Sequence, residues 1–402
     1  MLAAGNMVVP CALTALAVTA LFANVEGFSV TTRQAVGPST ASRKTHSTHV
    51  GTLCVSSAAT GGTDFGSMLG DKVASAIVNS PIYPLLVQQA KNTMKKSAEN
   101  IGVDWDDEVA RMRAAQDWDA ALSEMLEQST VDVPAYYNKP FHAYTDGNLC
   151  WEAAWEQHLA SKAVGVRNFP DDAQNGEHLL RKAYEGQMER LGVVVEDGGL
   201  IVDMGCGSGT STRYLAEQFP AAGSTVGFDL SPHMVLAGRF MAQEDENADP
   251  RVELRYGDAA ATGLPDASAS LVSLSLVVHE LSEEGRRDIL AEASRILRPG
   301  GSLAIMEMDP SAPGYVKLRK NPMIFSILRS TEPYLDVYFS KAGNIDSELF
   351  EAGFATVRKS DATGRHMTVV AVKGGTFDLR GTDDEREAAD THVASHKNPI
   401  KK

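Results

Sequence analysis

The sequence predicts an α/β fold with a mostly parallel sheet of seven strands, and three observations support that prediction. Strand-like and helix-like segments alternate from Leu200 onward, which is typical of a parallel sheet covered by helices on both faces. The first strand, Leu200–Met204, runs directly into a glycine-rich turn and a helix over Thr210–Gln218. The last two strands are separated only by Ser360–His366, which is too short for a parallel crossover, so they must form an antiparallel hairpin.

The composition excludes several classes of function. The 402 residues, of which 43% are hydrophobic and 22% charged, allow one large core or a core with a smaller domain. The net charge of −15 argues against a nucleic-acid binder that works by neutralising phosphates. The cysteines show neither CxxC spacing nor a cluster with histidine, so we expect no metal site and no disulfide scaffold. They are Cys11, Cys54, Cys150 and Cys206.

Residues 1–63 predict a leader in two parts. Val8–Ala23 is an apolar run, shorter than the ~20 residues of a membrane span, and the small residues Val25 and Gly27 follow it at a plausible cleavage point. Residues 28–63 contain no Asp or Glu and many Ser and Thr, which is the composition of a transit peptide. This combination resembles the leaders of algal plastids that derive from a red-algal endosymbiont. We therefore expect a plastid location, with no stable membrane span once the leader is removed.

The alternative for this leader is an ordinary secretory signal followed by a disordered linker. Secretion predicts paired cysteines, and the region after the leader has almost none, so we favour the plastid. Residues 375–402 are polar and charged without periodicity, which predicts a disordered tail.

Residues 64–190 have the periodicity of helices rather than strands. Apolar residues recur every three or four positions in two stripes; Gly102 ends the first helix, and Asp104 is predicted to cap the next. We interpret both stripes as packing surfaces. They consist of Leu86, Ala90, Met94, Ala98 and Ile101, and of Val109, Met112, Ala115, Trp118, Leu122 and Met125.

The stretch Pro134–Trp155 is unusually aromatic. Its irregular part, residues 134–148, is called the aromatic collar here and contains Tyr136, Tyr137, Phe141 and Tyr144. A solvated loop does not normally carry so many aromatic side chains. The collar is therefore either a structural element packed on the core or a wall of the substrate site, since clefts are lined by aromatics with a few polar groups.

The core is predicted from its strands and from the helix between the fourth and fifth of them. Ser282 can cap that helix, and Arg298–Gly301 is predicted to end it. The predicted strands are Leu200–Met204, Thr225–Asp229, Val252–Tyr256, Leu271–Val277, Gly301–Glu307, Phe354–Lys359 and Met367–Val372.

Four motifs in this core resemble those of class I S-adenosylmethionine-dependent methyltransferases, and among these the "type 11" small-molecule group. The motifs are Asp203–Gly209, Val226–Pro232, Gly257–Ala260 followed by Leu264-Pro265, and Leu297–Leu303, with Glu351–Phe354 extending the match. The resemblance implies a Rossmann-like sheet ending in an antiparallel hairpin, S-adenosylmethionine as cofactor and a small-molecule acceptor. It also implies a methyltransferase domain over residues 191–374, preceded by the helical segment 64–190. The oligomeric state stays open.

Asp229 ends the second strand 20 residues after Gly209, where a carboxylate can accept both ribose hydroxyls. It could also cap the following helix, although Ser231 fills that role better. The resemblance implies that the glycine turn lies under the methionine and ribose, that Asp203 orients the turn or the ammonium group, and that Asp258 and the Ala259 amide receive adenine. The turn residues are Gly205, Cys206, Gly207 and Gly209; Leu230 and Met234 cover adenine or are core. Cys206 is expected to be a small loop residue rather than a nucleophile.

Methyl transfer needs alignment and exclusion of water more than acid–base chemistry. His279, just after the fourth strand, is the candidate general base if the acceptor is a hydroxyl; alternatively it fixes the loop or packs under the cofactor. Glu280 and Glu307 are further candidates. The insertion Met308–Asn344 is aromatic and could close an apolar pocket for a quinone, isoprenoid or pigment precursor, or could be a lid without specificity.

Two other classes of function stay open at this point. One is an enzyme that uses the same cofactor site for different chemistry, such as an aminopropyl transferase, which would usually need an acidic polyamine site that does not stand out here. The other is a non-catalytic cofactor-binding assembly factor. A complete set of motif residues argues for retained binding and leaves catalysis open.

Overall fold

The computed structural model describes residues 80, 83–142, 144–320, 325, 328–329, 331–341 and 345–374. The predicted leader and tail lie outside these residues, and the domain boundaries stay predictions. Within the described part of the chain, no helix is long and apolar enough to cross a membrane.

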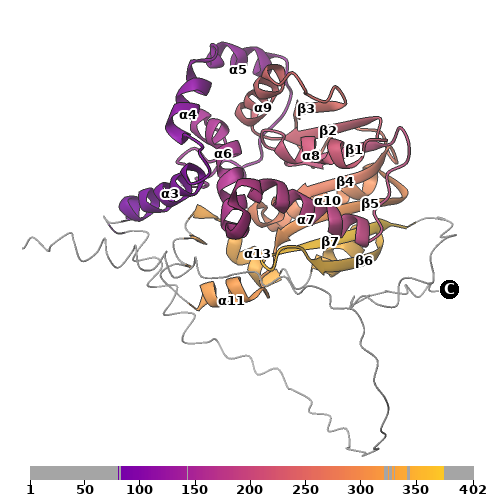
Figure 1. The fold of residues 1–402 in the computed structure, drawn as a ribbon. Coiled ribbons are helices and arrows are strands. Elements are labelled where there is room, and N and C mark those ends of the chain that lie inside the picture. The colour runs from indigo at the N-terminus through magenta and orange to yellow at the C-terminus, as the bar shows by residue number, and fades with distance from the viewer. Residues whose placement is uncertain are drawn as a thin grey trace, which may run out of the picture. The chain divides into compact units, whose positions relative to one another are not determined.

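The seven strands form one sheet in the order β3-β2-β1-β4-β5-β7-β6, as Figure 1 shows. The first five strands pair in parallel, whereas β7 pairs antiparallel with both β5 and β6, so the predicted hairpin at the sheet's end is confirmed. The strands are β1 (Leu200–Met204), β2 (Ser224–Asp229), β3 (Val252–Tyr256), β4 (Ala269–Ser275), β5 (Leu297–Met308), β6 (Phe354–Asp361) and β7 (His366–Lys373).

Two predicted boundaries in the core were wrong. β4 ends at Ser275 instead of Val277, because Leu276 adopts a φ of 60°, outside the extended range. Arg298–Gly301 was expected to be the turn after a helix, but β5 already begins at Leu297, where it pairs with Ala269 before the register shifts.

In the described part of the chain the helices precede the sheet or lie between its strands in sequence. They are α3 (Tyr83–Glu99), α4 (Trp105–Ala114), α5 (Trp118–Glu127), α6 (Trp151–Asn168), α7 (Gly176–Arg190), α8 (Thr210–Gln218), α9 (Pro232–Glu244), α10 (Glu283–Ile296), α11 (Pro313–Arg319), α13 (Leu335–Lys341) and α14 (Ile345–Glu351). Two short 3₁₀ segments, η1 (Pro170–Asn175) and η2 (Val278–Glu280), connect them. The predicted caps are confirmed, since Asp104, Ser231 and Ser282 each accept a hydrogen bond from a backbone amide of the following first turn.

Successive side chains of the strands point to opposite faces of the sheet. Ile201 of β1 packs with Leu180 of α7 and Leu215 of α8 on one face. Its neighbour Val202 belongs to the cluster on the other face, which includes Leu290 of α10. Both faces are therefore buried, as a parallel sheet requires.

The second predicted stripe of the helical segment lies on two helices instead of one. Asp117 interrupts it and caps α5 by accepting a hydrogen bond from the amide of Ala120 at 3.1 Å. Met112 and Trp118 then pack against Trp155 of α6, so the stripe is packing surface, as expected. Of the first stripe, the side chains of Leu86 and Ala90 lie outside the described residues.

Helix α6 is packed unusually close to α7. A Cβ on Gly165 of α6 would lie 2.2 Å from the backbone nitrogen of Glu177, and one on Gly176 would lie 2.5 Å from Gly165. Only glycine permits this backbone contact, which holds α6 across the edge of the sheet where β1 ends.

Candidate active site

The candidate site lies at the carboxyl ends of β2, β1, β4 and β5. In the strand order, β1 lies between β2 and β4, so the chain leaves β1 toward one side of the sheet and reaches β4 on the other. Such a switch in strand order opens a crevice at the carboxyl edge, where ligands bind in open α/β sheets. The glycine turn after β1 lies at this point.

The glycine turn is fixed by backbone hydrogen bonds to β2 and by side chains packed against it. The amides of Gly205 and Cys206 both donate to the carbonyl of Phe228, at 2.8 and 3.0 Å. Gly205, Gly207 and Gly209 all have positive φ, which favours glycine. A Cβ on these residues would lie within 2.6–2.7 Å of Val277, Gln157 and Leu254, respectively.

Asp229 holds the glycine turn through its buried carboxylate. Oδ2 accepts a hydrogen bond from the amide of Gly207 at 2.8 Å, and Oδ1 accepts one from the amide of Ser231 at 2.8 Å. The hydroxyl of Tyr137 also donates to Oδ1, at 3.3 Å. Burial raises the pKa of Asp229 above its ordinary value, and these donors oppose that rise. Helix α9 is capped by Ser231 and not by Asp229, because the Ser231 hydroxyl accepts a hydrogen bond from the amide of Met234.

Asp203 is a second buried carboxylate, at the end of β1. Its Oδ2 accepts hydrogen bonds from the hydroxyls of Ser211 at 2.6 Å and Thr212 at 2.7 Å. Its Oδ1 is buried and has no hydrogen-bond partner among the described residues. Burial raises the pKa of Asp203, and the two hydroxyls oppose that rise. A buried acceptor without a donor beside a glycine turn fits a ligand that carries an ammonium group.

The remaining predicted cofactor residues lie around the same turn. Cys206 is buried, and burial raises the pKa of its thiol well above the ordinary value, so a reactive thiolate is disfavoured. Asp258 accepts a hydrogen bond from the amide of Ala260 at 2.8 Å, next to the buried Ala259. Leu230 is buried, and Met234 packs in the cluster of Trp118 and Trp155.

His279 and Glu307 form a buried dyad across the ends of β4 and β5. The imidazole Nδ1 of His279 lies 2.8 Å from Oε1 and 2.9 Å from Oε2 of Glu307, and its backbone amide donates to the same carboxylate at 3.1 Å. The strained backbone at Leu276 turns the chain here, which places Val277 against Gly205 and His279 over Glu307. The loop that carries His279 therefore packs against the glycine turn.

The charges around the dyad favour a protonated His279. Burial opposes the imidazolium, but the Glu307 carboxylate outweighs it and raises the pKa of His279 to about 9. The Nε2 atom lies 3.9 Å from Oε1 of Glu280, beyond hydrogen-bond distance. Burial also raises the pKa of Glu280, to about 7.

The aromatic collar bridges this edge of the sheet and the insertion after β5. His142 lies between two carboxylates, with Nε2 at 3.1 Å from Glu332 and 3.5 Å from Glu280. Asn148 donates its side-chain amide to Glu280 at 3.3 Å, and its carbonyl accepts from the Ser231 hydroxyl at 2.6 Å. The collar is thus attached to both halves of the site.

Aromatic residues of the collar and of the insertion were predicted to close one pocket together, and the structure brings some of them together. The Tyr334 hydroxyl donates to the carbonyl of Tyr136 at 2.9 Å, and the two rings are 6.3 Å apart in an edge-to-face arrangement. The ring of Tyr338 lies 6.2 Å from His279. Tyr144 instead donates its hydroxyl to Glu156 of α6, away from the dyad.

Three side chains at the site belong to no sequence motif and were not predicted. Gln157 of α6 accepts a hydrogen bond from the amide of Ser208, and Arg181 of α7 donates to the hydroxyl of Ser275 at 2.9 Å. Glu332 is buried beside His142. No periodicity or motif indicated these three residues.

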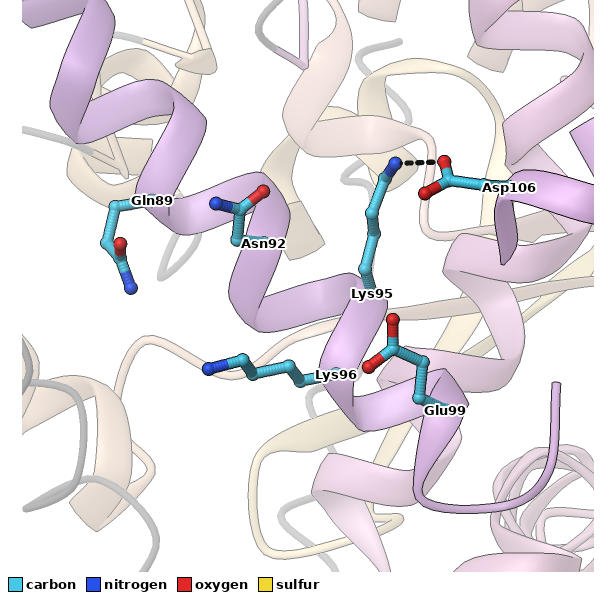
Figure 2. A pocket seen from close by; sticks show the side chains of 6 residues that line it. All are labelled: Gln89, Asn92, Lys95, Lys96, Glu99 and Asp106. Atoms are coloured by element: carbon cyan, nitrogen blue, oxygen red, sulfur yellow. Dashed lines mark hydrogen bonds and ion pairs between the residues drawn. The ribbon is translucent and has the colours of Figure 1, made fainter. Parts of the chain in front are cut away.

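A hollow at the surface lies apart from the site. Figure 2 shows it beside α3 and the start of α4, where Lys95 is paired with Asp106. Its volume is about 260 Å³, and none of its lining residues belongs to the site described above.

The comparisons with known proteins agree with this geometry. Residues 201–301 match the family model of a methyltransferase domain. A trans-aconitate 2-methyltransferase of Azoarcus is 35% identical over 131 residues, which are 32% of this chain and 47% of that protein. A probable chloroplastic tocopherol O-methyltransferase of rice is 29% identical over 171 residues, 40% of this chain and 44% of the relative.

A demethylmenaquinone methyltransferase of Listeria welshimeri is 27% identical over 149 residues, 37% of this chain and 59% of that protein. The chain thus spans about half the length of these curated relatives. Among solved structures, a putative S-adenosyl-L-methionine-dependent methyltransferase from Methanococcus maripaludis matches 57% of this chain and 95% of its own, with 18% identity and a TM-score of 0.41. The resemblance drawn from the motifs is confirmed as far as a methyltransferase domain, which residues 201–301 match.

Proposed function

We propose that the protein transfers a methyl group from S-adenosylmethionine to a hydroxyl of an apolar small molecule, such as a quinone, isoprenoid or pigment precursor. One observation carries the proposal: the loop that presents His279 to Glu307 packs against the glycine turn, with Val277 beside Gly205. A base directly beside a cofactor turn suits removal of a proton from the acceptor.

The cofactor half has side chains that fit S-adenosylmethionine. The unpartnered Oδ1 of Asp203 suits the ammonium group, and Asp229 suits the ribose. Asp258 and the Ala259 amide are proposed for adenine. When bound, the cofactor supplies an electrophilic methyl group; the residues of this chain hold it and exclude water.

In the acceptor half, His279 is proposed to take the hydroxyl proton at Nε2. Glu307 holds the proton of Nδ1 and thereby fixes the tautomer that leaves Nε2 as the acceptor. Tyr136, Tyr334 and Tyr338 are proposed as the apolar walls, which supports an acceptor with an apolar ring or chain. The names of the relatives, for trans-aconitate, demethylmenaquinone and tocopherol, support a small-molecule acceptor.

Two experiments test this function. In a thermal-shift titration, S-adenosylmethionine and S-adenosylhomocysteine should stabilise the protein and NAD should not; no shift with either sulfur compound would exclude the cofactor. A metabolite comparison of cells with and without the protein should then reveal one accumulated unmethylated precursor. Turnover with decarboxylated S-adenosylmethionine would favour an aminopropyl transferase, and binding without any turnover would favour an assembly factor.

We also propose that the protein works in a plastid. The absence of acidic residues from 28–63 supports this location, as does the word "chloroplastic" in the name of the rice relative. A fluorescent protein fused after residue 63 should enter the plastid of an alga with a red-algal-type plastid, whereas export from the cell would favour the secretory alternative.

A further inference from the structure

We propose that Tyr137 competes with the cofactor's ribose for Asp229, so that the aromatic collar must move away before S-adenosylmethionine binds. The inference rests on the proposed function, because it takes Asp229 as the ribose acceptor. It goes beyond that function by assigning the collar a closed state in which the cofactor site is blocked by the protein's own side chain.

The number of acceptor positions on Asp229 carries the argument. A carboxylate offers about two acceptor positions on each oxygen. Oδ1 already accepts from the Ser231 amide and the Tyr137 hydroxyl, and Oδ2 accepts from the Gly207 amide. A ribose diol that bonds to both oxygens needs a free position on each, but Oδ1 has none left.

Tyr137 is the donor that can leave. The amides of Gly207 and Ser231 are held by the glycine turn and by the start of α9, whose first turn Ser231 caps. The Tyr137 hydroxyl, in contrast, approaches from the collar on a single side chain, and its 3.3 Å contact is the longest of the three. Displacing it opens the needed position on Oδ1 without disturbing the turn.

The collar is built to move as one piece. Phe141 and Tyr144 exchange both backbone hydrogen bonds, at 3.1 and 2.7 Å. Gly147 is pressed onto the same loop, since a Cβ there would lie 2.2 Å from the carbonyl oxygen of Lys139. Tyr137 lies on this cross-linked loop, so its departure from Asp229 is coupled to the position of the whole collar.

The closed position is held by the contacts of Asn148 and Tyr334 described above and, at the seam with the insertion, by His142. Its amide donates to the carbonyl of Thr331 at 2.9 Å, and its imidazole pairs with Glu332. Its φ of 49° is strained for a residue other than glycine, and the side chain is 41% exposed. Water reaches the His142 side of this pair, although Glu332 is buried, so salt weakens the contact that holds the seam.

The test is the affinity of S-adenosylhomocysteine for the full chain with Tyr137→Phe, measured by calorimetry. The variant keeps the ring but lacks the competing hydroxyl, so a larger fraction of the protein is competent to bind. We expect affinity to rise roughly three- to tenfold, the net value of one ordinary hydrogen bond, because the 3.3 Å contact is long. The matched control is Tyr184→Phe on α7, whose hydroxyl bonds to the Ser273 hydroxyl away from the collar, and it should leave the affinity unchanged.

The outcomes separate this inference from the proposed function. If the wild type binds S-adenosylhomocysteine and Tyr137→Phe binds equally well or more weakly, Tyr137 does not compete and the inference is wrong. If the wild type does not bind at all, the proposed function fails and the inference with it. As a second measurement, His142→Asn should also raise the affinity and should speed hydrogen exchange of residues 134–148; slower exchange there, or weaker binding, would contradict a closed collar.

Discussion

The two halves of the site are built in different ways. On the β1–β2 side, Asp203, the glycine turn and Asp229 are close in sequence. Amides of the turn donate to Asp229 and to β2, and hydroxyls of the following helix donate to Asp203. On the β4–β5 side, His142, His279, Glu307 and Glu332 come from four distant segments and meet at side-chain carboxylates. The cofactor half is therefore a local motif that a family can retain, whereas the acceptor half can change with each segment that contributes to it.

The largest effect should come from breaking the dyad in the acceptor half. In Glu307→Gln the side chain keeps its size but loses the charge that orients and holds the imidazole. Above pH 9, where His279 is neutral in both proteins, kcat should therefore fall by roughly 10²–10⁴, the usual value of general-base catalysis. Turnover is measured with the acceptor that the metabolite comparison identifies. Because the cofactor half is built separately, affinity for S-adenosylhomocysteine should stay within about twofold. A kcat close to that of the wild type would mean that the dyad is structural.

The pH dependence of the catalytic rate should be set by the acceptor half as well. The pKa of His279 is raised to about 9, so below that pH most of the imidazole is protonated and cannot accept a proton. The rate should therefore rise about tenfold per pH unit toward pH 9 and level off above it. In Glu307→Gln the break should move down toward the ordinary histidine value of about 6.5. A flat profile between these values in the wild type would exclude His279 as the base.

In the cofactor half, Asp229→Ala should weaken S-adenosylhomocysteine binding by roughly 10- to 100-fold, because it removes the ribose acceptor and the carboxylate that holds the Gly207 amide. Calorimetry measures this affinity. Asp245→Ala, at the exposed far end of α9, is the matched loss of one carboxylate and should have no effect. Unchanged affinity in Asp229→Ala would refute both the ribose assignment and the competition by Tyr137.

The smallest expected effects are changes in the free energy of unfolding, at helices α6 and α7, which reach both halves of the site. Gly165→Ala places a Cβ 2.2 Å from the backbone of α7 and should lower the free energy of unfolding by about 1–3 kcal/mol. Gly186→Ala lies on the exposed side of α7 with open space around it, and it should stabilise by about 0.5–1 kcal/mol. Urea unfolding of the two variants gives the comparison; equal effects would mean that α6 and α7 are not held by this contact.

The same difference explains what the sequence could predict. The seven strands, their hairpin and the caps at Asp104, Ser231 and Ser282 follow from local patterns, and all are present. The β4 boundary was missed because the positive φ of Leu276 has no signal in a leucine side chain.

The contacts of Tyr137 with Asp229 and of His142 with Glu332 were out of reach for another reason. Each contact joins residues that are far apart in the chain, and a single sequence does not indicate which distant residues come together in the fold. The aromatic content of the collar indicated that it was not a solvated loop, but it could not say which carboxylates the collar would contact.

The tryptophans give the protein a built-in optical probe. All four lie in the helices before the sheet, at Trp105, Trp118, Trp151 and Trp155. Intrinsic fluorescence at long excitation wavelengths therefore reports on α4–α6 alone and is silent about the sheet. The ring of Trp151 lies 4.6 Å from His233 of α9, so its emission is sensitive to any shift between α6 and the helix that follows Asp229. Movements around the cofactor edge can thus be followed in real time without a label.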